Sequence, residues 1–435
     1  MLAVQKIPVF LSNRTPNGIL PQDLPGLHHP WLLQKRGAAL KRFLKAGMPT
    51  QNDEDWRHTN LAIFDTQPIQ RADGTTPVQS KINLSDTSCG RVVFVNGILN
   101  TELSELGHLP KGLSVVSMRQ KLEDKHAILH DFFPEVKGSD AWHDLNMALF
   151  DDGACIEVAE GTVIEQPLEV ICLATAQEQA TAYHARNIIH LHEGASLKIY
   201  KSKAAYATTI NFATHMTSII LEKNATFERV VLSQHAPKGI AFTHDDVTLH
   251  EGAVFKKTAI NLGGKITRQK TTLCIDGENA FASVGALTHV SGEGTTDVMV
   301  DMRHNVPHTQ SKQLIRSLAK DKGRAVFQGK ITVAQIAQKT DAAQNHQGML
   351  LSETAEINAK PSLEIYADDV KCSHGNTCGA LDEDALFYLQ SRGIPRTEAA
   401  QLLQQAFIAE LFEECDEPLR ETLITRIAQT LQAGG

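Results

Sequence analysis

The sequence is poor in aromatic side chains, which make up 6% of its 435 residues, and it contains no long apolar run. Because a transmembrane helix needs about 20 consecutive apolar residues, we expect no membrane span. The opening stretch, MLAVQKIPVFLSNRTPNG, also lacks the apolar core and cleavage site of a signal peptide. The net charge of −8 gives no reason to expect a nucleic-acid surface. These absences predict a cytoplasmic protein that binds neither membranes nor nucleic acid.

The cysteines are few and scattered, and their odd number argues against a disulfide framework. The seven are Cys89, Cys155, Cys172, Cys274, Cys372, Cys378 and Cys415. A reducing compartment suits such a set, which again indicates the cytosol. We expect the first four to fill the core, because free cysteine is among the most buried residue types.

Motifs of common catalytic sites are also missing from the sequence. It has no nucleophile elbow, no phosphate-binding loop, no dinucleotide fingerprint and no HExxH zinc motif. His190 and His192 alternate on an expected strand, and we expect both to face solvent. Any ATP hydrolysis linked to this protein must therefore come from a partner.

A short motif, of which L-H-E-G-A is the clearest form, recurs through the middle of the chain. Its copies end at Thr162, Ala195, Ala225, Ala253 and Ala280, which are 33, 30, 28 and 27 residues apart, and a late echo ends at Ala355. A period near 30 without helical patterns between the copies predicts a β-solenoid over residues from about 155 to 371. The alternative is a β-sandwich with similar hairpin turns.

Helical patterns flank this repeat region on both sides. Near the start, Leu33, Leu40, Phe43 and Leu44 share one face of a helix expected to begin near Pro30 and to end at Gly47. We expect a helical region over residues 1–85, a β-helix core over 86–375 and a helical domain over 376–435.

Shorter elements are expected within the first part of the chain. The pattern predicts a loop over residues 66–81, a strand over 91–95 that runs into an Asn96-Gly97 turn, and a helix over 139–150.

The segment from residue 360 to 395 carries the main chemical signal. Cys372 and His374 are two residues apart on an expected strand, so both side chains point to one face. Gly375 is expected to end the strand, and a helix capped by Asp382 follows and stops at Gly393. Thiolate and imidazole are ligands of iron and of iron–sulfur clusters. Taken from spacing alone, core packing of the cysteine is the competing interpretation.

The same segment resembles a known family. The runs D-D-V-K-C-S-H-G-N-T over 368–377 and L-F-Y-L-Q-S-R-G-I over 386–394 are similar to the C-terminal signature of the SufB/SufD family, whose members are scaffolds of iron–sulfur cluster assembly. Echoes such as W-R-H-T from Trp56 and F-V-N-G from Phe94 extend over most of the chain. The length, the N-terminal pattern and the lack of a cysteine-rich N-terminal motif favour the SufD branch.

The resemblance implies a fold and a role. The fold would be mainly β, with a right-handed parallel β-helix flanked by α-helical domains. The role would be that of a non-catalytic subunit of the SufBCD complex, pairing with SufB and docking the SufC ATPase. Cys372 and His374 would then be metal ligands shared with the partner subunit at a nascent, transient iron–sulfur cluster, with none bound stably by the isolated chain, which could instead form a homodimer.

The C-terminal helices would dock SufC. Phe387, Tyr388 and Phe407 are large apolar candidates in an acidic surround, and with Arg392 they form the predicted partner-binding set. Alternatively, these aromatic residues form the core of the helical domain itself. Cys378 could approach His374 across the expected turn, and its role stays open.

Two other functions compete with the scaffold. A β-helix can carry a carbohydrate-active enzyme such as a lyase or an esterase, which would need clustered charged residues and exposed aromatic side chains. A homodimeric structural protein without metal is the plainer possibility.

Overall fold

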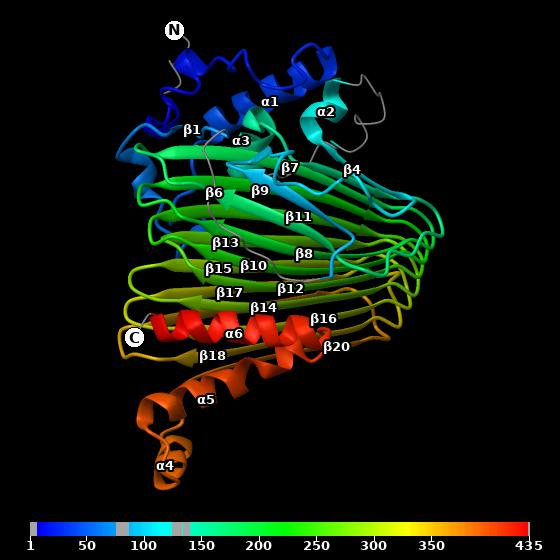
Figure 1. Cartoon of the computed structure of the whole chain (residues 1–435). Coiled ribbons are helices and arrows are strands. Elements are labelled where there is room, and N and C mark those ends of the chain that lie inside the picture. Colours follow the sequence, from blue (N-terminus) through cyan, green and yellow to red (C-terminus); the bar gives the residue numbers. More distant parts are fainter. Residues whose placement is uncertain (1–6, 75–86, 124–132, 134–139, 434–435) are drawn as a thin grey trace.

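A computed structural model of the chain describes residues 7–74, 87–123, 133 and 140–433. Its centre is a parallel β-solenoid of about eight turns, in which each turn gives one strand to each of two sheets (Figure 1). The solenoid predicted from the repeat is therefore confirmed, and the sandwich alternative is wrong, because strands from successive turns pair in parallel.

The first sheet contains the odd-numbered strands from β5 onward, together with β1 and β4. Its parallel members are β5 (Ala154–Val158), β7 (Thr181–Leu191), β9 (Asn211–Leu221), β11 (Gly239–Leu249), β13 (Ile266–Ile275), β15 (Thr295–His304), β17 (Arg324–Val333) and β19 (Glu356–Ile365). At its N-terminal edge β4 (Leu113–Ser117) runs antiparallel to β5. The two-residue strand β1 (Gln70–Arg71) pairs with β7.

The second sheet faces the first across the solenoid core. Its parallel members are β2 (Gly90–Val95), β6 (Leu168–Ala174), β8 (Ser196–Ala205), β10 (Thr226–His235), β12 (Val254–Gly263), β14 (Phe281–Val290), β16 (Gln310–Ala319), β18 (Asp341–Leu350) and β20 (Lys371–Ala380). The short strand β3 (Ile98–Leu99) runs antiparallel to β2 at the N-terminal edge.

The repeated motif forms the corners between the two sheets. Ala195, Ala225 and Ala253 are fully buried on the inside of successive corners. The residue before each alanine has a positive φ, as at Gly194 (65°) and Asn224 (56°). Glycine and asparagine adopt this left-handed conformation at low cost, which explains why they recur at these positions.

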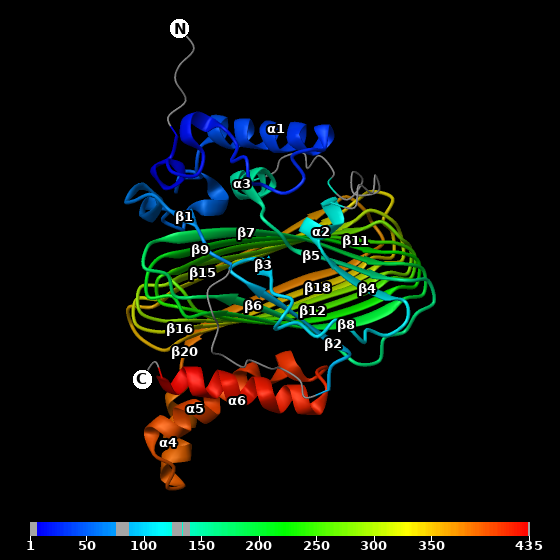
Figure 2. The ribbon, with the colours of Figure 1, turned by 45° about the horizontal axis from the view of Figure 1, so that its top comes forward.

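The helices cover the outer faces of the two sheets. They are η1 (Val9–Leu11), η2 (Pro16–Gly18), α1 (Pro30–Ala46), η3 (Glu54–Trp56), η4 (Ala62–Asp65), α2 (Met118–Glu123), α3 (Ala141–Leu149), α4 (Glu383–Ser391), α5 (Arg396–Ala409), η6 (Glu410–Phe412) and α6 (Glu417–Ala433). Figure 2 shows α1 and α3 over one face of the solenoid and α6 over the opposite face. Among the described residues, none of these helices is long and apolar enough to cross a membrane.

Two separate apolar layers attach the helices to the sheets. The N-terminal layer joins Phe43 and Trp142 to Phe212 and Phe242, which project from the outer face of the first sheet. The C-terminal layer consists of residues of β8 to β16 together with residues of α5, η6 and α6. Each sheet is therefore apolar on both faces, as expected for parallel strands covered by helices.

Most of the local predictions in the first part of the chain are confirmed. The helix at Pro30 runs to Ala46 and ends at Gly47, whose φ is 76°. The prediction for Leu33 needs correction, because this residue is 46% exposed while its neighbour Leu32 is fully buried. Leu40 and Phe43 are buried as expected, and together with Leu32, Arg36 and Ala39 they form the buried stripe of α1, to which Leu33 does not belong.

The shorter elements also largely agree with expectation. Asn96 and Gly97 form the predicted turn with φ of 49° and 80°, and α3 begins after Asp140, whose side chain accepts a hydrogen bond from the His143 amide. The expected loop over 66–81 lies partly outside the described residues, and β1 interrupts its described part.

Candidate functional site

The last coil of the solenoid is open. β19 and β20 have partners only on one side, β17 and β18, and they form the C-terminal edges of the two sheets. At the other end, the short antiparallel strands β3 and β4 occupy the corresponding edges. An edge strand presents unpaired backbone groups on which another chain can add a strand. The two ends of the solenoid therefore differ, and only the C-terminal end offers two full-length parallel edges.

Cys372 and His374 lie on β20 at this edge, and the prediction that both face the same way is confirmed by their register. Cys372 is opposite Ala342 and His374 is opposite Gln344, both of which point into the solenoid core. Cys372 is half-buried against the end of the core, whereas His374 is exposed. Burial raises the pKa of the Cys372 thiol, and the nearby Asp341 carboxylate adds to the rise. The thiol therefore keeps its proton in the isolated chain until a cation displaces it.

The prediction that Gly375 ends the strand is wrong. β20 continues to Ala380, in register with β18 along ten residues, and Gly375 lies in its middle opposite Asn345. Glycine has a low propensity for strands, which predicted an end at this position. The hydrogen-bonded pairing with β18 of the preceding coil nevertheless keeps the strand extended.

Cys378 accordingly does not approach His374 across a turn. The two residues lie four apart on one strand, so their Cα atoms are separated by about 13 Å at 3.3 Å per residue. The Cys378 side chain lies over Gly348, where an added Cβ would be 3.3 Å from its sulfur. The structure thus separates Cys378 from the Cys372–His374 pair.

A polar column lies beneath His374 inside the last coils. Gln344 and then Gln313 occupy the same rung in the two preceding coils, and the side-chain amide atoms of both are buried without a hydrogen-bond partner among the described residues. On the next rung, His346 stacks on Phe327 with ring centroids 5.2 Å apart and bonds to Asn376 of β20 at 2.7 Å. The solenoid core below Cys372 and His374 therefore contains buried polar side chains among the apolar ones.

One thiol and one imidazole offer two potential ligand atoms, half of the number in a four-coordinate site. Among the residues that the structure describes, the one set of three His, Cys, Asp or Glu side chains whose ligand atoms gather within 4.8 Å is Glu157, His190 and His192, near the N-terminal end of the solenoid. Any cluster at the C-terminal edge needs ligands from outside the described part of this chain.

The expectation that His190 and His192 face solvent needs correction. Both point away from the core, but the His190 side chain is only 15% exposed because Glu222 covers it. Burial lowers the pKa of His190, although its hydrogen bond with Glu222 opposes this effect. The repeat could have signalled this arrangement, because the register places Glu222 one coil beyond His192 at the same corner.

The predicted partner-binding residues divide into two groups. Phe387 and Tyr388 are 74% and 58% exposed on α4, and Arg392 lies near the Tyr388 ring at 5.3 Å. Figure 1 shows α4 and α5 projecting beyond the coils at the open end. Phe407 is different, because it is half-buried in the layer between the helices and the second sheet, with Arg316 5.8 Å from its ring. The prediction of a helical-domain core thus holds for Phe407 alone.

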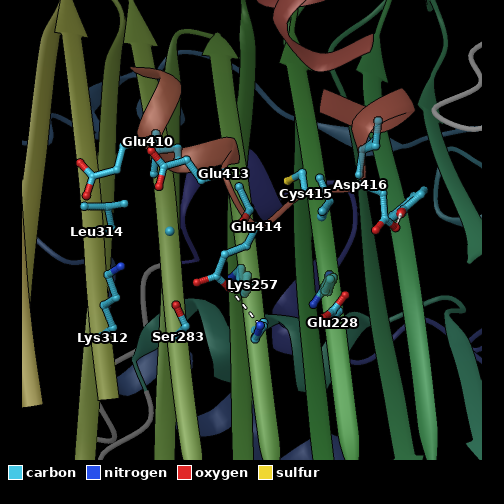
Figure 3. Close-up of a pocket in the computed structure, with 18 residues that line it drawn as sticks. Glu228, Lys257, Ser283, Lys312, Leu314, Glu410, Glu413, Glu414, Cys415 and Asp416 are labelled. Atoms are coloured by element: carbon cyan, nitrogen blue, oxygen red, sulfur yellow. Dashed lines mark hydrogen bonds and ion pairs between the residues drawn. The ribbon is translucent and has the colours of Figure 1, made fainter. Parts of the chain in front are cut away.

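Charge complementarity fixes the C-terminal helices to the second sheet. Figure 3 shows the acidic side chains of the segment around η6 over the strands, in a pocket between helix and sheet. Glu414 pairs with Lys256 at 3.0 Å and Asp416 pairs with Lys198 at 3.1 Å. Part of the acidic charge of the C-terminal helices therefore forms ion pairs with lysines of the second sheet.

The remaining cysteines match the expectation in part. Cys155 and Cys172 are buried, whereas Cys89 and Cys274 are half-buried. Burial raises the pKa of Cys155 to about 12, so this thiol is inert at neutral pH.

Fold and edge together define a class of protein, namely a parallel β-solenoid whose final coil has open edges and carries a thiol and an imidazole. Sequence comparison gives the family. The model of the SUF system FeS cluster assembly SufBD core domain matches residues 173–407, and that of the SufBD protein N-terminal region matches 26–170. The chain belongs to the SufBD family.

Individual relatives agree with this assignment. The chain is 32% identical to the iron–sulfur cluster assembly protein SufD of Escherichia coli, over 91% of this chain and 92% of the relative. It is 26% identical to the SufBD family protein slr0076 of Synechocystis, over 88% and 87% of the two chains. It is also 24% identical to the chloroplastic protein ABCI7 of Arabidopsis thaliana, over 87% and 82%.

Proposed function

We propose that this chain is a scaffold subunit of the SUF machinery, on which a nascent iron–sulfur cluster forms at an interface with a SufB subunit. The observation that carries the proposal is the position of Cys372 and His374 on the free edge of β20. Thiolate and imidazole are both established ligand types for iron–sulfur clusters. The similarity to a protein named as SufD supports the same role here.

The open coil supplies the surface for the SufB partner. Ile357 and Leu363 on the inner face of β19 are half-buried, and no further strand of the described chain covers them. A second solenoid that adds its edge strands here would bury these side chains and pair the free backbone groups. It would also bring the missing ligands and exclude water and oxygen from the cluster.

The isolated chain is then expected to bind metal modestly and to hold no cluster stably. A second copy of this chain can occupy the same open edge, so a homodimer is the expected form when SufB is absent.

The SufC ATPase would dock on the arm formed by α4. Phe387 and Tyr388 are exposed aromatic side chains of the kind that anchor interfaces, and Arg392 lies beside them. Family membership supports a scaffold over the carbohydrate-active alternative. Incubation of the purified chain with polyuronides should release no unsaturated products.

The test of the proposal is the variant His374→Ala in the complex co-expressed with SufB and SufC. His374 is exposed and makes no core contact, so folding and complex formation should be retained while the cluster content falls severely. Iron and sulfide content and visible absorbance of the anaerobically purified complex measure the effect.

Cys378→Ala is the matched control, since Cys378 lies on the same strand face about 13 Å away at 3.3 Å per residue. It should keep the wild-type cluster content. Wild-type cluster content in the His374→Ala complex would end the ligand hypothesis and leave His374 as an interface residue.

A further inference from the structure

A second group of metal-ligand side chains lies on the outer surface of the first sheet, near the end of the solenoid opposite to Cys372 and His374. It consists of Glu157, His190, His192 and Glu222, which we call the His–Glu cluster. Glu157 lies on β5 beside His190 of β7 in the parallel ladder. His192 and Glu222 directly follow β7 and β9 at the same corner of successive coils. The fold therefore gathers residues from three consecutive strands of one sheet.

The side chains of the His–Glu cluster converge closely. His190 Nε2 lies 2.7 Å from Glu222 Oε1, and His192 Nε2 lies 2.9 Å from Glu157 Oε1. Glu222 Oε1 is also 3.2 Å from His192 Nδ1, so one carboxylate contacts both imidazoles. The two imidazole rings are 4.1 Å apart between centroids.

These distances fit a common metal ion. Two ligands of a tetrahedral ion, each about 2.0–2.1 Å from it, are separated by roughly 3.3 Å. The 2.9 Å contact between His192 Nε2 and Glu157 Oε1 needs only a small side-chain rotation to reach this value, and Glu157, His190 and His192 each bring one ligand atom within 4.8 Å of the other two. Such rotation is available, because the side chains of His192 and Glu157 are 31% and 48% exposed. The 3.2 Å contact uses the other nitrogen of His192, Nδ1, so Glu222 holds the imidazoles by hydrogen bonds and is not counted as a ligand of the same ion.

The type of donor restricts the ion. Imidazole nitrogen and carboxylate oxygen without thiolate suit zinc and neighbouring divalent transition metals, whereas iron–sulfur clusters rely on thiolate. A shallow hollow lined by Gly112, Ser114 and Glu160, among others, opens beside Glu157 and His192 and gives an ion access from solvent.

We propose that Glu157, His190 and His192 of the His–Glu cluster bind one divalent transition-metal ion of the zinc class, which joins β5 to the end of β7 near the N-terminal end of the first sheet. The site is separate from the iron–sulfur edge and does not depend on the proposed scaffold function. The competing account is that the histidines and glutamates only form hydrogen-bonded pairs.

The test is a titration of the tag-free, chelator-treated full chain with Zn²⁺, followed by calorimetry and by the change in melting temperature. Wild type should bind one ion and melt at a higher temperature with Zn²⁺. His190→Ala and His192→Ala should each weaken binding at least about tenfold, because each removes one of the first ligands. Glu157→Gln, which keeps the size of the side chain, guards against an effect of misfolding.

Co²⁺ serves as the spectroscopic probe, because thiolate ligation would add a charge-transfer band that nitrogen and oxygen ligands do not give. We expect visible bands without that band. His250→Ala is the matched control, since His250 has the same place in the L-H-E-G-A motif two coils further along and is exposed. It should bind Zn²⁺ as wild type does.

Equal Zn²⁺ affinity of the wild type, His190→Ala and His192→Ala would overturn the proposal in favour of simple hydrogen-bonded pairs. Loss of binding in His374→Ala with retention in His190→Ala would also overturn it, because the ion would then belong to the open edge.

Discussion

At the scale of single residues, His304 couples the stability of the solenoid to pH. Its ring is fully buried, and its two nitrogens bond to Thr309 and Ser311 at 2.7 and 2.8 Å. Burial lowers the pKa of His304 to about 4 from its ordinary value of 6.5. The folded state therefore keeps this imidazole neutral at a pH at which the unfolded chain binds a proton.

The sign of the effect follows from this difference. Between pH 6.5 and about 4 the unfolded state binds more protons, so stability falls as the pH falls, by about 1.4 kcal/mol per pH unit for each such histidine. We expect the urea midpoint to decrease from pH 7 to pH 5. In His304→Gln the free energy of unfolding should depend less on pH, because one fewer proton is taken up on unfolding. An unchanged slope would contradict the assignment to His304.

A second prediction concerns the glycines of the corners. Gly252 has a φ of 64°, and an added Cβ would lie 2.3 Å from Asn224 Oδ1. Gly252→Ala should therefore lower the free energy of unfolding by about 1–2 kcal/mol from the backbone alone. Gly37→Ala is the control, because Gly37 lies inside α1 with no atom within 4 Å of an added Cβ. It should stabilise the protein by up to about 1 kcal/mol, and denaturant unfolding measures both.

At the scale of elements, the arm formed by α4 can be tested without disturbing the solenoid. The double substitution Phe387→Ala and Tyr388→Ala removes two exposed side chains and should leave the melting temperature unchanged. Binding of SufC should fall at least about tenfold, since anchor residues each contribute 1.4 kcal/mol or more. Pull-down and calorimetry with purified SufC measure this, and undiminished binding would exclude α4 as the docking element.

Deletion of residues 381–435 would be a poorer test of SufC docking than the double substitution. Leu423 and Ile427 of α6 and Phe412 of η6 are fully buried against the second sheet. Removing them would expose the apolar outer face of five strands, from β8 to β16. Loss of SufC binding in that truncation would therefore mix two causes.

The sequence predicted some elements correctly and others not. Elements set by local interactions were predictable, whereas elements set by pairing between distant segments were not. The early corners were predictable because a positive φ favours glycine or asparagine largely independently of the surroundings, whereas later positions such as His308 and Lys339 adopt a positive φ without that signal. The pair Cys372 and His374 was predictable because alternation along a strand is a local property. The end of β20 was not, since ten residues of pairing with β18 decide it and not Gly375. The His–Glu cluster was missed because Glu157 and His190 meet only through the register of two coils.

At the scale of the whole molecule, the two ends of the solenoid have different edge structures. Antiparallel strands blunt the N-terminal edges, and helices cover both outer faces. The open coil is the one place where both sheets end in long parallel edges. Another chain that adds strands to these free edges would therefore bind at the end that carries Cys372 and His374.

This polarity also sets an order of events during protein synthesis. Each strand from β7 onward pairs with the strand two places earlier in the chain, so every coil emerging from the ribosome finds its template already made. The coil with Cys372 and His374 is the last coil to be translated. The C-terminal helices follow it, and α6 packs back across β8 to β16. A nascent chain cannot offer the open edge formed by β19 and β20 before the rest of the solenoid exists. The presence of that edge thus reports that every earlier coil of the solenoid has already been made.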